Sequence, residues 1–237
     1  MYSCLPWELR HHIHTFCVQG PYDNEVIVRR ATGNMSVLLI RQSTGTHSYQ
    51  WVEDPVLLQL SPDRLGPDLA RELLETYYRT RTFKFVHEQL GTVSSFLKGD
   101  KFWLAMRPAD HVRRVQIQIA PFRNAQLRMP NLKDEDEVRC HQALVSLGDL
   151  QHPRSNVDIR VDLAQGFVDE EEYEDLLNDA AGFLFRVVKQ LNILKMHGLN
   201  VDLTFEGKWD AREGTKLCSN SVCSLDECIS KMRIACQ

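Results

Sequence analysis

Four cysteines near the end of the chain come closest, by residue type and spacing, to a metal site. They are Cys218, Cys223, Cys228 and Cys236. A structural zinc site usually takes its ligands in pairs two to four residues apart, each pair on a tight turn. Here the cysteines are separated by four, four and seven residues, and a predicted helix lies between the last two. We therefore expect no metal or other cofactor, with a zinc or iron–sulfur site on these thiols as the alternative.

Three histidines are crowded into the first helix-like segment, residues 5–18. His11 and His14 are three residues apart, about one helical turn, a spacing that metal sites can use. A metal would need a third ligand, and no carboxylate stands nearby in the matching helical phase. We therefore expect these side chains to form a solvated polar face, with Ile13 turned inward.

Asp158, Asp162 and Asp169 stand along and just after a segment that alternates as a β-strand. Open α/β sheets bind ligands at the carboxyl ends of their strands, so a cation site here is one alternative. However, Asp158 and Asp162 alternate with apolar residues and share a face with Arg160. That pattern is typical of the wet side of a pleated strand, and we expect no chemistry from it.

The segment 71–114 interleaves basic and aromatic residues, as sites for single-stranded nucleic acid do. Its aromatic residues Tyr77, Phe83 and Phe85 fall in the apolar phase, which places them in the core. We interpret the basic residues, Arg81 among them, as a solvated face and expect no nucleic-acid binding. The chain also lacks the phosphate-loop, dinucleotide, serine-elbow and zinc-protease motifs, so we expect that it is not an enzyme.

Helical and strand periods alternate along the chain, which predicts an α/β or α+β fold. After the helix at 5–18, short apolar runs predict a β-hairpin or meander over 25–60, with its third run at 56–58. Further helices are predicted at 61–78, 86–97, 137–147, 169–197 and 224–234, and strands at 82–85, 115–119, 157–163 and 201–205. The last strand–helix–strand series predicts a βαβ unit with parallel pairing and a right-handed crossover. A short leucine-rich-like solenoid is an alternative arrangement of these units.

Composition bounds the class of protein and its compartment. The 237 residues carry 28 basic and 32 acidic side chains, a formal net charge of -4, which predicts no bulk attraction to nucleic acid or anionic lipid. No run approaches the ~20 apolar residues that cross a bilayer, and the opening residues lack the apolar core of a secretory signal. Seven cysteines, an odd number, fit a reducing compartment, so we expect a cytoplasmic or nuclear protein.

The opening residues carry the strongest functional signal. Residues 5–13, L-P-W-E-L-R-H-H-I, resemble the L-P-x-E-[LI]-R-x-x-I opening of F-box-like proteins of filamentous fungi. Two further blocks are similar to that family in order and distance: A-R-E-L-L-E-T-Y-Y at 70–78 with T-F-K-F at 82–85, and F-L at 96–97 with V-R-R-V-Q-I at 112–117. The resemblance covers about residues 5–120.

The resemblance implies an F-box-like module at 1–120, and the βαβ-containing portion with its cysteine-bearing tail follows at 121–237. F-box proteins dock on the Skp-type adaptor of a cullin–RING ubiquitin ligase. By the resemblance, Leu5, Pro6, Leu9 and Ile13 would contact such an adaptor, as an amphipathic helix does in a partner's groove.

The second half would then recognise a protein substrate, which makes the chain an intracellular interaction module and a substrate receptor. Two alternatives stand beside this interpretation. The apolar stripe of the first helix packs on the chain's own β-meander, as expected of a short amphipathic helix. Alternatively, the chain is a divergent enzyme or metal protein that uses the C-terminal cysteines or the strand-end aspartates.

Overall fold

The structure, a computed structural model, describes residues 5–19, 24–31, 36–44, 48–120, 130–162, 170–206, 215–218 and 224–235. An 8-stranded mixed sheet runs through it in the order β3-β2-β1-β4-β5-β6-β7-β8. The strands are β1 (Glu25–Arg30), β2 (Ser36–Ser43), β3 (Tyr49–Glu53), β4 (Thr82–Phe85), β5 (Arg114–Ile119), β6 (Asn156–Asp162), β7 (Asn200–Glu206) and β8 (Thr215–Cys218).

Helices precede the sheet and connect its strands. The longer ones are α1 (Trp7–Gln19), α4 (Pro67–Thr80), α7 (Pro130–Ser146), α8 (Glu170–Met196) and α9 (Leu225–Ala235). The shorter ones are α2 (Pro55–Gln59), α3 (Pro62–Leu65), α5 (Val93–Lys98) and α6 (Pro108–His111), with 3₁₀ turns at His87–Thr92 and Leu147–Asp149. The α/β fold class and the alternation of helices with strands are confirmed.

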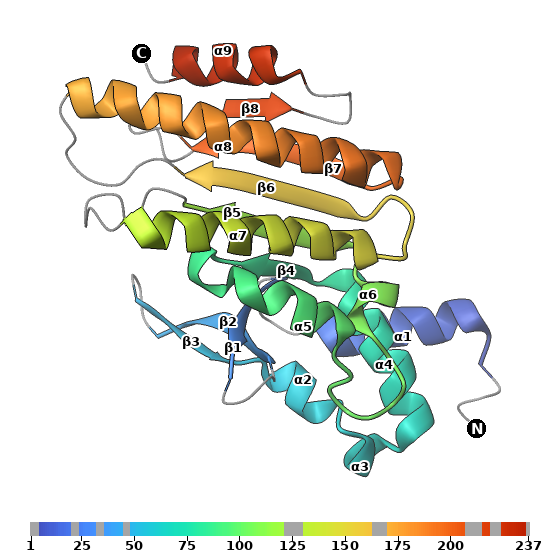
Figure 1. The fold of residues 1–237 in the computed structure, drawn as a ribbon. Coiled ribbons are helices and arrows are strands. Elements are labelled where there is room, and N and C mark those ends of the chain that lie inside the picture. Colours follow the sequence, from blue (N-terminus) through green and yellow to red (C-terminus); the bar gives the residue numbers. More distant parts are fainter. Residues whose placement is uncertain are drawn as a thin grey trace.

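The strands of the parallel part follow one another in chain order. β1, β4, β5, β6 and β7 pair in parallel, whereas β1-β2-β3 form an antiparallel meander and β8 runs antiparallel to β7. The predicted parallel βαβ unit is confirmed by β6 and β7, where Ile159 pairs with Leu203. Each crossover advances the chain by one strand, and α5, α7 and α8 lie over the same face of the sheet (Figure 1). This advance in one direction is a feature that solenoids share.

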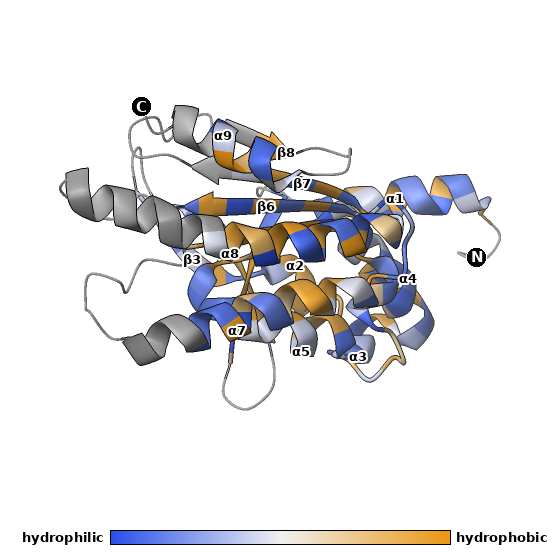
Figure 2. Ribbon diagram, turned by 45° about the horizontal axis from the view of Figure 1, so that its top comes forward, coloured by the Kyte–Doolittle hydropathy of each residue, from blue (hydrophilic) through white to orange (hydrophobic). Residues whose placement is uncertain are grey.

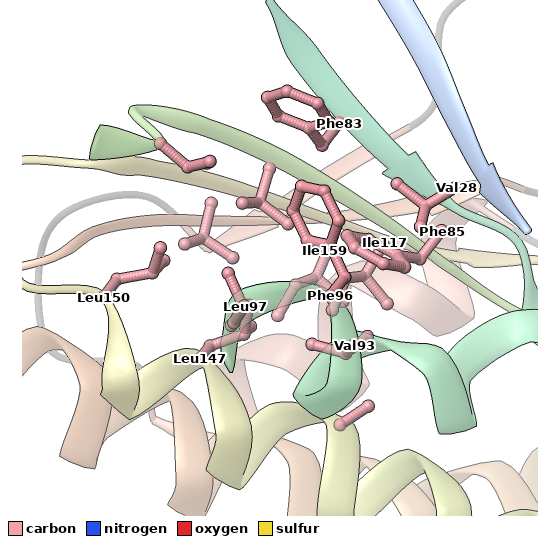
Figure 3. Packing of buried hydrophobic residues seen from close by; sticks show 14 of the residues in the cluster. Val28, Phe83, Phe85, Val93, Phe96, Leu97, Ile117, Leu147, Leu150 and Ile159 are labelled. Atoms are coloured by element: carbon pink, nitrogen blue, oxygen red, sulfur yellow. The ribbon is translucent and has the colours of Figure 1, made fainter. Parts of the chain in front are cut away.

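Alternate residues of the parallel strands form one face of the hydrophobic core. The buried set on β4, β5 and β6 consists of Phe83, Phe85, Val115, Ile117, Ile119, Val157, Ile159 and Val161. Figure 3 shows several of these side chains packed against Phe96 and Leu97 of α5 and against Leu147 and Leu150. The ring centroids of Phe83 and Phe96 lie 4.9 Å apart. Burying each large apolar side chain contributes about 1.5–3 kcal/mol, so this layer holds the sheet and helices together.

The prediction that the apolar run at 56–58 forms the third strand of the meander is wrong. Residues 56–58 are helical and belong to α2, and the third strand is β3, one segment earlier. Asp54 begins α2 because its Oδ1 accepts a hydrogen bond from Val56 N at 2.9 Å, and Pro55 occupies the first helical position. An aspartate cap followed by proline is a helix-start signal, and here it outweighs the β-propensity of Val56.

The sheet and its core continue across the predicted boundary between residues 120 and 121. β5, on one side, pairs along its length with β6 on the other, from Arg114–Asn156 to Ile119–Val161. The hydrophobic core likewise includes residues from both parts. No helix in the described part of the chain combines the length and apolarity needed to cross a membrane.

Candidate protein-interaction surface

Helix α1 lies beside α4 at one end of the molecule (Figures 1 and 2). Its first turn is closed by a hydrogen bond from Arg10 N to Pro6 O at 3.1 Å. Proline suits this position because the first residues of a helix have no intrahelical partner for an N–H. The short L-P opening therefore starts the helix, and α4 provides the surface against which it packs.

The face of α1 that meets α4 is largely polar. Arg10 Nη1 donates to both carboxylate oxygens of Glu72, at 3.0 and 3.3 Å. His14 Nε2 lies 3.6 Å from the second of these oxygens, and the His14 side chain is buried. Of the apolar side chains on α1, Val18 alone is buried among the described residues. Polar contacts with one glutamate thus hold the middle turn of α1 against α4.

The end of α1 is held by a buried cation. Arg81 follows the last residue of α4 and is completely buried. Its Nη2 donates to the carbonyl oxygens of Val18 at 2.8 Å and Gln19 at 3.3 Å. The last carbonyls of a helix lack intrahelical donors and carry partial negative charge, so a guanidinium there satisfies both needs. The expectation that Arg81 belongs to a solvated face is wrong.

Arg81 is itself held by two buried groups. The Tyr77 hydroxyl donates to Asp54 Oδ2 at 2.7 Å, and Arg81 Nη2 lies 3.9 Å from the same oxygen. The guanidinium carbon lies 5.5 Å from the centre of the Tyr77 ring. Burial, with a smaller effect of the Asp54 charge, raises the pKa of Tyr77, so its phenol stays a donor. This network ties α1 to α4 and to the start of α2.

Four apolar side chains at the start of the chain face away from the protein. We call them the α1 ridge: Leu5, Leu9, Ile13 and Phe16. Their exposed fractions are 36%, 52%, 44% and 83%. Within α1, steps of four and three residues place Leu9, Ile13 and Phe16 on one side, and Leu5 stands just before the helix begins. Pro6 and the free thiol of Cys17 are exposed as well. An exposed row of large apolar side chains is typical of a surface that meets a partner.

The internal alternative for this stripe is therefore wrong, and so is the expected orientation of the histidine-bearing face. Ile13 points outward and His14 inward. The physical reason lies on α4, where Glu72 offers a carboxylate and Arg81 takes the carbonyls at the end of α1. Polar groups of α1 are satisfied by turning toward α4, which leaves the apolar side chains at the surface.

Of the four clustered cysteines, the structure describes the side chain of one. Cys228 is buried on α9, and burial followed by the charge of Glu227 raises the pKa of its thiol. Cys218 ends β8, while Cys223 and Cys236 lie outside the described residues. Among the described residues, no group of three or more histidine, cysteine or acidic side chains is placed to hold a metal ion.

The aspartates of β6 lie on the polar side of the sheet, as expected from the pleat. Asp158 Oδ2 accepts a hydrogen bond from Arg160 Nε at 2.9 Å.

Asp162 borders a cavity of about 470 Å³ at the carboxyl ends of β1, β4, β5 and β6. His87 also lines it, but Nδ1 of that ring accepts from Ala120 N at 3.2 Å and Nε2 lies 3.4 Å from an Asp136 oxygen. The hydrogen bond from Ala120 N makes His87 a structural link to the end of β5. Asp169 lies outside the described residues.

We predict that Arg81→Met lowers the free energy of unfolding by about 3–5 kcal/mol, because it leaves Asp54 and two helix carbonyls buried without their cation. Arg79→Met is the matched control on the same helix. Arg79 pairs with Glu75 one turn away at the surface, so its loss should cost about 0.5 kcal/mol or less. Urea unfolding of both variants measures the difference. Equal losses would contradict the role assigned to Arg81.

We also predict that stability falls as the pH drops below about 6.5, in part through His14. Burial lowers the pKa of His14, and the charges of Glu72 and Glu75 offset part of that effect. Between the folded pKa and the unfolded value of 6.5, the unfolded chain binds more protons, so the free energy of unfolding decreases with decreasing pH. Above 6.5 both states are neutral and the contribution is constant.

Urea unfolding at pH 7.5, 6.5 and 5.5 measures this slope. His14→Gln should make it shallower without abolishing it, because burial also lowers the pKa of His111. The exposed His12→Gln on the same helix should keep the slope of the unaltered chain. A His14→Gln protein with an unchanged slope would show that the docking of α1 does not depend on a neutral imidazole.

We compared the chain with known protein families, curated proteins and solved structures. No family model, curated protein or solved structure matches the chain. The function proposed next therefore draws on the α1 ridge and on the motif resemblance of residues 5–120.

Proposed function

We propose that this chain is a protein-interaction module whose α1 ridge docks on a Skp-type adaptor, as in F-box substrate receptors of cullin–RING ubiquitin ligases. One observation carries the proposal: the amphipathic helix α1 is turned so that its polar side packs on the protein and its apolar side meets solvent. Three of the four residues that the F-box resemblance assigns to adaptor contact, Leu5, Leu9 and Ile13, belong to this ridge.

The energetics favour a partner of this kind. Each large apolar side chain that becomes buried contributes about 1.5–3 kcal/mol, and the ridge exposes four such side chains in one row. An apolar row spaced by three and four residues is what a hydrophobic groove recognises in a helix. Because Arg81 and Glu72 hold the backbone of α1 in place, binding would order few further groups and lose little entropy.

The remaining surface would serve the second task of a receptor, the recognition of a protein substrate. The proposal places the chain in the cytoplasm or nucleus, where such ligases act, and assigns it no catalytic step of its own. Adaptor and substrate would then bind at different places on one sheet-based scaffold.

We predict that Leu9→Asp with Ile13→Asp weakens adaptor binding about 100-fold or more while the chain stays folded. Both side chains are about half exposed, so charges there meet water in the free protein and an apolar groove in the complex. The measurement is titration calorimetry with purified fungal Skp-type adaptor, with circular dichroism and the melting temperature as tests of folding.

Val138→Asp with Val145→Asp is the matched control, because these two valines are exposed to a similar degree on α7. This variant should bind the adaptor as the unaltered chain does. As a second readout, bound adaptor should slow alkylation of Cys17, which borders the ridge. No binding by the unaltered chain, or equal binding by both double variants, would refute the proposal.

A further inference from the structure

A second site lies away from the α1 ridge, in a half-open cavity of about 110 Å³. It is formed between β2, the end of α4, α5 and the segment that follows α5. Leu38, Phe96 and Pro108 give it apolar walls, and Tyr78, Asp100 and Lys101 bring polar groups. An enclosed cavity of ~150 Å³ can hold the six carbons of benzene, so this smaller, half-open one suits about four buried heavy atoms, with the rest of a compact group at its mouth.

Tyr78 gives the cavity a specific polar feature. Its side chain is only 1% exposed, and its ring packs against Tyr77, Phe83 and Phe96. Within the described part of the chain its hydroxyl has no hydrogen-bond partner, in contrast with Tyr77, which bonds to Asp54. Burial, followed by the charge of Asp100, raises the pKa of Tyr78, so the phenol stays protonated. The hydroxyl oxygen itself is not fully buried, so it opens onto the cavity, where a ligand or water can accept from it.

The segment 99–107, whose first three residues line the cavity, has a strained shape beyond them. Asp100 accepts hydrogen bonds from Leu104 N at 3.1 Å and Met106 N at 3.3 Å, and Arg71 Nη2 donates to Leu104 O at 2.9 Å. Trp103 and Ala105 adopt left-handed backbone angles, with φ of 57° and 54°. Left-handed residues other than glycine are unfavourable and gather at ligand-binding segments. The Trp103 side chain is 92% exposed, beside the cavity in sequence.

The charged groups at the cavity already act on partners within the protein. Asp100 accepts from Leu104 N and Met106 N, and Lys101 lies in the field of Glu53, so an added anion or cation gains little from them. Either ion would also lose water against the apolar walls. We infer that this cavity binds a small neutral group with a compact apolar body and one hydrogen-bond acceptor, which receives the Tyr78 hydroxyl. Such a group belongs to a free carbonyl compound or to an apolar side chain with its backbone carbonyl.

The test is an NMR titration of the full chain with cyclopentanone, and with cyclopentane, cyclopentylamine and cyclopentanecarboxylate for comparison. Cyclopentanone should shift the amides of Ser95, Gly99 and Lys101 and bind more tightly than the other three. Tyr78→Phe should weaken cyclopentanone about three- to tenfold and leave cyclopentane unchanged, because only the hydroxyl is lost. Tyr77→Phe is the matched control: it removes a hydroxyl that serves Asp54 and should leave both affinities unchanged.

A peptide arm separates the two sources of the ligand. If the group belongs to a peptide, a neutral pentapeptide with a central leucine should bind more tightly than N-acetyl-leucine methylamide. If it belongs to a free compound, cyclopentanone should bind and the pentapeptide should gain nothing over N-acetyl-leucine methylamide. Absence of shifts at the cavity, equal cyclopentanone affinity in Tyr78→Phe, or preference for an ionic probe would overturn the inference. Ser95→Leu, at the exposed rim, should block every probe.

Discussion

The buried guanidinium of Arg81 is the interaction on which the position of α1 depends. α1 inserts one apolar side chain, Val18, and otherwise contacts α4 through polar groups. Arg81 connects the free carbonyls at its end to Asp54 and Tyr77, so that the charge, the carboxylate and the phenol satisfy one another inside the protein. A buried cation is destabilising by itself, and this one is tolerated because each neighbour is an acceptor or an aromatic face.

The orientation of α1 follows from this network and decides how the chain can be used. A helix that exposes its apolar side gives up burial that most helices use for stability. Here the contacts of Glu72 and Arg81 fix the helix, and the ridge from Leu5 to Phe16 stays exposed. Under the proposed function, stability and binding would use opposite sides of one helix, so changes on the ridge should leave folding intact. The cavity at Tyr78 is separate from both.

Much of the fold could be predicted from the sequence because periodicity is local. The alternation of Val157, Ile159 and Val161 marked both the strand and its buried side. The signal for the start of α2 is equally local. Asp54 followed by proline predicts a helix start, and this signal should have been given more weight than the strand-like apolar run after it. The role of Arg81 was not local: it acts on Val18, 63 residues earlier in the chain. Periodicity identifies which residues of α1 share a side, whereas the groups that α4 offers decide which side turns inward.

The advance of the parallel strands in chain order has a mechanical consequence. Each of these strands hydrogen-bonds only to its neighbours, so a disturbance at one edge of the sheet reaches the other through the strands between them. α1 rests on the unit of α4, whereas α9 rests on β8 and α8 at the other extremity. Fraying at the α9 extremity would have to pass through several intermediate units before it reached α1.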